Sequence, residues 1–524
     1  MLRSSLQRGL MGSVALVVAT GGGALANSGG APTASDEVAF WLILAGCLAF
    51  LVPVGLTLLA SGAAPEEKAA DVALTSLAAI GLGVLGYFAC GFAFQFGGIG
   101  LFFQLPGLED LIWEWSFLDV RWGPGWGMVG LQGFFLGGEA DNPAAYALFF
   151  SQLALVTTVV LIPALSLRGR VKAIVIVLGA LLLSAVIYPI LGNWVWGGGW
   201  LAHLGSNLGL GHGFIDFAAA GLVNLVGGTA ALAGILVFKL RRPKEEERPS
   251  PDTVSPLSAR ALSVPPSERK PAEMPPVHLP LLAILGSLLL VVGWLGWALA
   301  SPLSALTDVS PAVVAVNLLL AAAGGTLVAT LYSWFTTGRA DILMATRGLA
   351  IGLVSISATV PFVRPWAALL TGAMAGLLLP LTIYLLDYIL RLDDSTAAVS
   401  VHGLGGLLGL LALGFFADGR YGAGWNGIGA TEYLGVLGQG VSGYFTARGF
   451  QPDWPGQLYA QLIGLAAIFA LTFVLTWVLF RVLRGLIQAW EGTGLELGRA
   501  PKPKAVASDE PSDEREEEEE ETPA

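Results

Sequence analysis

Two stretches of the sequence, 216–228 (DFAAAGLVNLVGG) and 394–406 (DSTAAVSVHGLGG), share a pattern that decides the fold. In each stretch an aspartate is followed eight residues later by a polar side chain, Asn224 or His402, and then by a glycine pair. Eight helical residues rise about 12 Å, which carries a chain from a membrane interface towards the centre of a roughly 30 Å hydrocarbon core. We therefore expect Asn224 and His402 to approach mid-membrane from opposite sides, as in transporters built from inverted repeats.

The rest of the chain has the composition of a membrane protein. Its 524 residues are 55% hydrophobic and 12% charged, with a mean hydropathy of +0.71, whereas soluble domains carry roughly a quarter charged residues. A span needs about 20 apolar residues, and eleven stretches qualify, at 38–61, 71–97, 144–166, 173–192, 214–238, 279–301, 311–335, 342–361, 366–390, 397–417 and 457–483. The predicted fold class is an all-α polytopic membrane protein, with eleven transmembrane helices arranged as a 5+5 inverted repeat plus one C-terminal helix.

The basic residues predict how the spans are oriented. If the mature N-terminus lies outside, the inner loops hold Lys68, Arg168, Arg170, Lys172, Lys239, Arg241, Arg242, Lys244, Arg339, Arg391, Arg481 and Arg484. The outer loops then hold only Arg121, Arg364, Arg420 and Arg448. This bias predicts a multi-pass protein of the cell (inner or plasma) membrane, with its N-terminus outside and its C-terminus in the cytoplasm.

Four stretches are predicted to lie outside the membrane. Residues 1–26 resemble a secretory signal peptide, because two arginines precede a short apolar stretch and an A-x-A site; a short uncleaved anchor is the alternative. Residues 240–277 are rich in Pro, Ser and charge and predict a disordered cytoplasmic linker, and residues 499–524 predict a disordered acidic tail. The outer loop 98–142 is rich in Trp and acidic residues, and is interpreted either as an ordered cap or as an interfacial aromatic belt.

A polar or ionisable side chain inside a membrane is costly, and is a functional hypothesis by default. A lone histidine is often a satisfied core residue, but the placement of His402 as the repeat partner of Asn224 favours a pore residue. We expect Asp216 to be both a helix N-cap and a charge that shapes the pore. We expect Asp394 to be only a cap, together with its neighbour Asp393.

The remaining sequence argues against other function classes. It offers no nucleophile–base set, no metal-ligand cluster and no phosphate loop, so it predicts neither an enzyme nor a bound cofactor. It also predicts no nucleic-acid surface. Cys47 and Cys90 lie inside apolar runs and are interpreted as small hydrophobic residues.

Several short motifs, taken as a set, resemble the Amt/Rh ammonium transporter family. They are Tyr188-Pro189, WGGG at 196–199, Asp216-Phe217-Ala218, GWLGW at 293–297, Leu392-Asp393-Asp394, Val401-His402-Gly403 and EGTGLE at 491–496. The resemblance covers about 38–498 and defines an Amt-like transmembrane domain over 27–498. It implies a homotrimer in the lipid bilayer with a pore in each subunit, and it raises a P-II-type cytoplasmic regulator as a candidate partner.

Carried over position by position, the resemblance implies an outer site for ammonium. Trp196 and Ser301 would form it, because an indole ring gives cation–π attraction and a hydroxyl accepts a hydrogen bond. The aromatic walls and gate below would involve Phe149 and Trp297, and Leu153 stands where the family has a second gate ring. The pore set implied by the resemblance is Leu153, Trp294, Asn224 and His402.

The main departure from the family lies at the centre of this pore. Asn224 stands where the family has the first of two histidines. A bare ammonium ion in a low-dielectric lumen is costly, so the family's histidines are thought to help ammonium shed a proton. Asparagine can accept a hydrogen bond but cannot titrate, so a two-site proton relay is broken on one side. Ala397 and Leu167 also stand where the family commonly has acids.

The sequence therefore predicts transmembrane transport of ammonium or ammonia. The alternative is an ammonium sensor or regulatory membrane protein with weak or no conduction, which the long linker and acidic tail would suit. A third option is transport of another small neutral or cationic solute.

Overall fold

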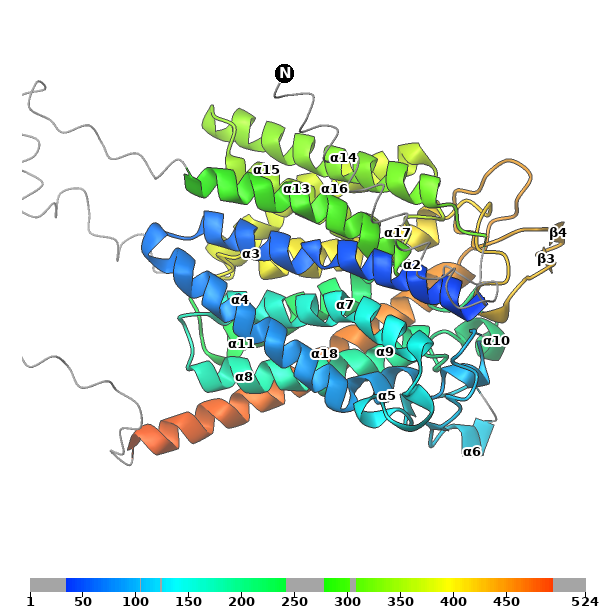
Figure 1. Cartoon of the computed structure of the whole chain (residues 1–524). Coiled ribbons are helices and arrows are strands. Elements are labelled where there is room, and N and C mark those ends of the chain that lie inside the picture. Colours follow the sequence, from blue (N-terminus) through cyan, green and yellow to red (C-terminus); the bar gives the residue numbers. More distant parts are fainter. Residues whose placement is uncertain (1–33, 104, 123–124, 242–277, 302–307, 493–524) are drawn as a thin grey trace, which may run out of the picture.

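The computed structural model describes residues 34–103, 105–122, 125–241, 278–301 and 308–492. The predicted signal peptide, the acidic tail and residues 242–277 of the predicted linker lie outside the described residues. Long helices run side by side along one common axis, and the connecting loops gather at the two ends (Figure 1).

The first half of the chain contributes one block of helices and a short hairpin. Its elements are α2 (Ala34–Ala49), α3 (Leu51–Ala63), α4 (Glu66–Gly86), η1 (Tyr87–Gly91), α5 (Phe92–Phe96), η2 (Ile99–Leu101), β1 (Glu114–Trp115), α6 (Asp119–Trp122), β2 (Val129–Gly130), η3 (Phe134–Leu136), η4 (Gly138–Ala140), α7 (Pro143–Leu167), α8 (Ala173–Leu182), η5 (Leu183–Ile187), α9 (Tyr188–Trp196), α10 (Leu204–Leu208), η6 (Ala220–Leu225) and α11 (Val226–Val237). Strands β1 and β2 pair antiparallel, with Glu114 opposite Gly130.

The second half contributes further helices, a second short hairpin and one long C-terminal helix. Its elements are α13 (His278–Leu299), α14 (Pro311–Thr337), α15 (Ile342–Ile356), α16 (Pro365–Tyr384), η10 (Leu385–Ile389), η11 (Ala398–Gly403), α17 (Leu404–Phe416), η12 (Trp425–Gly427), β3 (Glu432–Tyr433), β4 (Val436–Leu437) and α18 (Gly456–Gly492). Strands β3 and β4 pair antiparallel in the loop region between α17 and α18.

The predicted all-α membrane class is confirmed, but the count of eleven full-length spans is not. Ten helices of the described residues are long and apolar enough to cross a membrane. The predicted span 342–361 corresponds to α15, whose 15 residues end at Ile356. Beyond that end the carbonyls of Ser357 and Ala358 accept hydrogen bonds from the backbone N–H groups of Ala218 and Phe217, at 3.1 and 3.4 Å. The chain after α15 therefore pairs with the segment ahead of η6, and the helix does not continue.

Close backbone contact joins the helices of the two halves. A Cβ on Gly55 of α3 would lie 2.7 Å from the carbonyl oxygen of Gly286 in α13, and one on Gly286 would lie 2.6 Å from the carbonyl oxygen of Gly55. Small residues at such crossings let membrane helices pack by van der Waals contact where lipid provides no hydrophobic drive. The abundant glycine of the sequence is used here for packing.

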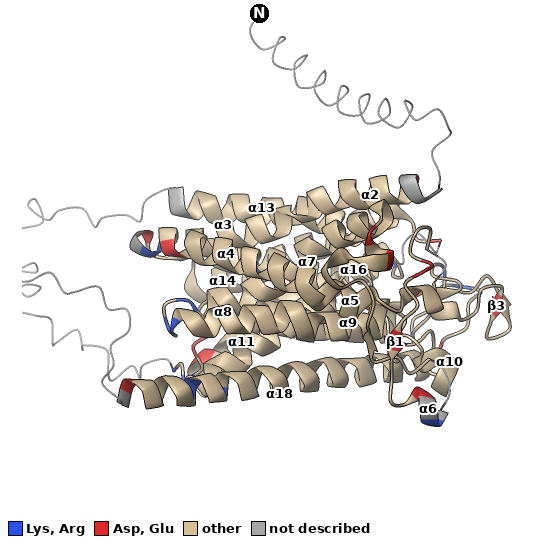
Figure 2. Cartoon of the chain, turned by 60° about the horizontal axis from the view of Figure 1, so that its bottom comes forward, with Lys and Arg blue, Asp and Glu red and all other residues tan. Residues whose placement is uncertain are grey.

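Charged side chains are confined to the ends of the bundle (Figure 2). At the end where α7 leads into α8, Arg168 pairs with Asp71 at 2.9 Å and Arg170 pairs with Asp393 at 2.7 Å. The opposite end carries the loops with β1 to β4, α6 and α10 (Figures 1 and 2). The bundle thus has one end where α7 leads into α8, which carries the Arg168 and Arg170 ion pairs, and an opposite end covered by folded loops.

Candidate functional site: a buried Asn–His pair between two matching stretches

Each of the two matching stretches, 216–228 and 394–406 (called the two repeats below), contains the same unusual break in its backbone. Ala219 and Ala397 occupy equivalent positions and both adopt the left-handed conformation, with φ of 59° and 57°. This conformation is uncommon for residues other than glycine. Each is followed by a π-helix, η6 or η11, before the ordinary helix resumes. π-Helical turns are rare and often lie at functional sites, and here the same distortion occurs in both repeats.

Asp216 and Asp394 hold these breaks in place. In each case the carboxylate accepts hydrogen bonds from the backbone N–H groups five and six residues further on, at 2.8–2.9 Å for Asp216 and 2.8–3.1 Å for Asp394. A carboxylate at a helix start satisfies N–H groups that have no partner inside the helix and complements the helix dipole. The structure therefore places both aspartates in capping positions.

Asn224 and His402 meet across the boundary between the repeats. Asn224 is fully buried and His402 is 7% exposed. The amide of Asn224 donates from Nδ2 to the carbonyl oxygen of Ala219 at 3.0 Å, which leaves Oδ1 as an acceptor 2.7 Å from Nδ1 of His402. Nδ1 of His402 must then carry the proton, because an amide oxygen can only accept. It follows that Nε2 is the basic nitrogen of a neutral His402.

Glycines bring this pair together. A Cβ on Gly228 would lie 2.5 Å from the backbone nitrogen of Gly403, and one on Gly406 would lie 2.4 Å from the carbonyl oxygen of Ala220. Gly228 and Gly406 are equivalent in the two repeats, and each faces the π-helix of the other repeat. The glycine pairs of the sequence pattern are therefore the points where the two repeats touch.

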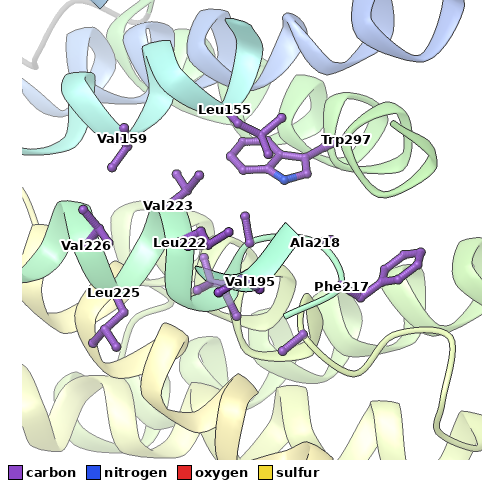
Figure 3. Packing of buried hydrophobic residues seen from close by; sticks show 14 of the residues in the cluster. Leu155, Val159, Val195, Phe217, Ala218, Leu222, Val223, Leu225, Val226 and Trp297 are labelled. Atoms are coloured by element: carbon purple, nitrogen blue, oxygen red, sulfur yellow. The ribbon is translucent and has the colours of Figure 1, made fainter. Parts of the chain in front are cut away.

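A dense hydrophobic region includes Val223 and Leu225, the chain neighbours of Asn224 (Figure 3). Side chains from α7, α9, η6, α11 and α13 pack there, and the figure labels Leu155, Val159, Val195, Leu222, Val223, Leu225, Val226 and Trp297 among them. Trp297 stacks on Trp294 with ring centroids 5.1 Å apart, and Trp294 Nε1 donates to Ser357 Oγ at 2.8 Å. The region is closely packed and apolar, which suits a small neutral molecule better than an ion.

The predicted outer residues lie towards the looped end of the bundle. Trp196 is buried at the end of α9 and donates from Nε1 to the carbonyl oxygen of Asp216 at 2.9 Å. Ser301 is buried just beyond α13. Phe149 stacks on Tyr87 with centroids 5.4 Å apart, and Leu153 is buried one turn further along α7. The structure links Trp196 directly to the cap of η6.

A cavity of about 450 Å³ reaches His402 from the end that carries the ion pairs. Its apolar wall includes Ile162, Leu165 and Val401. Its rim holds Lys68, Asp71, Arg168, Arg170, Arg347 and Asp393. In the sequence Arg168 and Arg170 served only to predict orientation, and Arg347 was not singled out, because nothing local shows that the three border the same opening.

Sequence reasoning also missed a buried polar network that joins η1, α5, α7 and α9. Tyr87 donates to Gln95 at 2.9 Å, Gln95 Nε2 donates to Gln152 Oε1 at 3.4 Å, and Tyr188 donates to Gln152 at 3.0 Å. All four side chains are fully buried. Of these four residues, the sequence singles out only Tyr188, in the Tyr188-Pro189 motif. An amide inside an apolar stretch, as at Gln95 and Gln152, was the signal that could have found the others.

The family model described as the Ammonium Transporter Family matches residues 39–262 and 257–489. The chain belongs to the ammonium transporter family.

Sequence and structure comparisons agree with this membership. The chain is 32% identical over 479 residues to ammonium transporter Amt2 of Archaeoglobus fulgidus, and the match covers 90% of this chain and 88% of that protein. A solved sensor Amt protein superposes with a TM-score of 0.63 and 26% identity, covering 86% of this chain and 94% of that one. Mep2 of Candida albicans superposes with a TM-score of 0.61 and 21% identity, over 88% of this chain and 86% of that one. The last likeness shows the fold alone.

Proposed function

We propose that this protein transports ammonium or ammonia across the membrane through a passage in each subunit. The observation that carries the proposal is the buried Asn224–His402 pair, held at 2.7 Å where the two repeats of an ammonium transporter family chain touch. The pair provides one basic nitrogen in otherwise apolar surroundings. A single acceptor in such a place suits a cation that must lose a proton to cross.

The two residues of the pair have different roles in this proposal. Asn224 cannot take up a proton, but its hydrogen bonds with Ala219 and His402 fix the tautomer of the imidazole. His402 accepts a proton at Nε2 as ammonium becomes ammonia, and the hydrogen bond from Nδ1 to the Asn224 amide oxygen keeps the imidazole oriented. Ammonia then passes to the cavity at the other side of His402.

The outer residues recruit the ion in this proposal. Trp196 presents an indole ring near the start of η6, and Ser301, Phe149 and Trp297 add a hydroxyl and aromatic surface. Cation–π attraction to an indole is about 0.5–2 kcal/mol depending on desolvation. Leu153 and Trp294 then line the apolar passage between this site and the Asn224–His402 pair.

Further parts of the proposal concern assembly and orientation. We place the protein in the cell membrane as a homotrimer, with the end that carries Arg168 and Arg170 in the cytoplasm. The large exposed apolar side chains of α14 and α16, such as Leu327, Phe335 and Leu377, suit lipid or a neighbouring subunit. Cleavage of the signal peptide is proposed from the residue pattern of 1–26, and binding of a P-II-type regulator is proposed from family membership.

The proposal is tested by measuring flux and current in proteoliposomes under an ammonium gradient. We expect wild-type protein to carry ammonium-dependent flux and the His402→Leu variant to lose most of it, while Gly485→Ala, which has open space around its Cβ, keeps it. No flux from correctly folded wild-type protein would overturn transport. Ammonium binding without flux would instead support the sensor alternative.

A further inference from the structure

We propose that Glu114 and Asn193 form a second cation site on the looped side of the protein, which takes ammonium within one helical turn of Trp196. The site lies where strand β1, which carries Glu114, sits beside α9, which carries Asn193 (Figure 2). The inference rests on the proposed function, since it takes ammonium as the cation.

The carboxyl of Glu114 is enclosed by backbone. A Cβ on Gly127 would lie only 2.0 Å from Glu114 Oε1, and one on Gly98 would lie 2.6 Å from Glu114 Cβ. The carbonyl oxygen of Gly127 also accepts a hydrogen bond from the backbone of Trp200 at 3.1 Å, just past the end of α9. Glycine at 98 and 127 therefore makes the room in which the Glu114 side chain folds inwards.

Two oxygen atoms in this enclosure have no hydrogen-bond donor. They are Oε1 of Glu114 and Oδ1 of Asn193, and both atoms are buried. The Asn193 side chain is fully buried, and its amide hydrogen-bonds the Glu114 carboxyl, so the two groups adjoin. Buried acceptors without donors are costly. A proton on the carboxyl or a cation between the two groups would satisfy them.

The chemistry of the acceptors favours a small monovalent cation. A carboxylate and an amide carbonyl offer oxygen atoms only, and an ammonium ion can donate several N–H bonds to them. Among the described residues no group of three His, Cys, Asp or Glu could hold a metal ion. Asn193 precedes Trp196 by three residues, so the two side chains lie on one face of α9. An ion at Glu114 would thus lie within one helical turn of the Trp196 indole.

Protons would compete with the cation for this carboxyl. Burial raises the pKa of Glu114 to about 7, and the nearby Asp119 carboxylate raises it further, while the hydrogen bond from Asn193 lowers it. At pH 8 the carboxyl is largely ionised and at pH 6 it is largely protonated. A cation that needs the ionised form should bind about tenfold more weakly at pH 6 than at pH 8.

The test is a binding isotherm on the full-length protein in detergent, followed by tryptophan fluorescence and by calorimetry. Ammonium chloride is compared with potassium chloride and sodium chloride at pH 6 and pH 8. We expect ammonium to bind about tenfold more tightly at pH 8, and Glu114→Gln to bind about tenfold more weakly than wild type at pH 8, which corresponds to about 1.4 kcal/mol. Glu139→Gln, a change at an exposed acid of the same loop, should behave as wild type.

Each outcome decides the proposal. Equal affinity of the wild type for ammonium at pH 6 and pH 8 would overturn it, and this comparison does not depend on the folding of any variant. Equal affinity in Glu114→Gln and wild type would also overturn it, and equal shifts with potassium would overturn the assignment to ammonium. Binding is measured without flux, so a protein that binds at Glu114 but does not transport would refute only the proposed function. A His402→Leu variant that loses ammonium flux but still binds ammonium would support both the proposed transport function and the Glu114 site.

Discussion

Substitution of Gly228 by alanine is expected to disturb the contact between the two repeats most directly. Gly228 does not contact the Asn224–His402 hydrogen bond, but it lies one turn after Asn224 and faces the residue that follows His402. Substitution by alanine places a Cβ between α11 and η11, where both neighbours are backbone. Side chains therefore cannot rotate away to relieve the overlap, and the two repeats must separate.

The size of that separation follows from the structure. The new Cβ would lie 2.5 Å from the Gly403 nitrogen, and an ordinary contact of this kind is about 3.4 Å or more, so the helices must part by about 0.9 Å. A displacement along the line of the pair would lengthen the 2.7 Å Nδ1 to Oδ1 distance to about 3.6 Å, beyond hydrogen-bond range. Overpacking costs about 1–3 kcal/mol and the lost hydrogen bond about 0.5–1.5 kcal/mol. We expect a total loss of about 1.5–4.5 kcal/mol in the free energy of unfolding.

The assay combines thermal unfolding in detergent with ammonium flux in proteoliposomes. Gly228→Ala should unfold at a clearly lower temperature and lose most of its flux. Gly485→Ala in α18 is the matched control, because its Cβ meets nothing within 4 Å and alanine favours a helix over glycine by about 1 kcal/mol. A Gly228→Ala protein with wild-type stability and wild-type flux would refute the reasoning that glycine contact sets the geometry of the pair.

Three further predictions follow from individual side chains. Asn224→His should add a second titratable group beside His402, so the ammonium-dependent current should gain a new pH dependence; an unchanged pH profile would show that Asn224 does not limit proton movement. Asp216→Ala should lower the free energy of unfolding by about 1–2 kcal/mol, because two backbone N–H groups lose their cap; thermal unfolding measures this, and an unchanged midpoint would contradict it. Burial lowers the pKa of His212, in the loop after α10, from 6.5 to about 4. The folded protein thus resists protonation, and the stability given by neutral His212 is present above about pH 6.5 and lost as the pH falls towards 4. Between pH 7 and pH 4 this titration should lower the free energy of unfolding of the wild type by roughly 3 kcal/mol more than that of His212→Phe. Unfolding of both proteins at the two pH values measures the difference, and equal losses in both proteins would exclude His212 as the cause.

The sequence predicts those parts of the site that lie in the two matching stretches. The shared spacing of 216–228 and 394–406 located Asn224, His402 and both caps, because a duplicated pattern is visible without any contact information. The left-handed Ala219 and Ala397 were not predicted, since alanine gives no sign of positive φ. Glu114 appeared only as one of several acids in an outer loop, and its burial depends on glycines in two other segments.

The sequence by itself determined the membrane class, the order of the spans and the residues at the repeat centres. These follow from hydropathy and spacing, which are properties of single segments in lipid. Tertiary structure alone decided the short α15, because the carbonyls just beyond its end accept hydrogen bonds from the chain ahead of η6. It also decided which ion pairs gather at the mouth of the cavity. It also decided the tautomer of His402, which depends on an amide 178 residues away. Such features arise from contacts between distant segments, and a linear pattern does not encode which of them will meet.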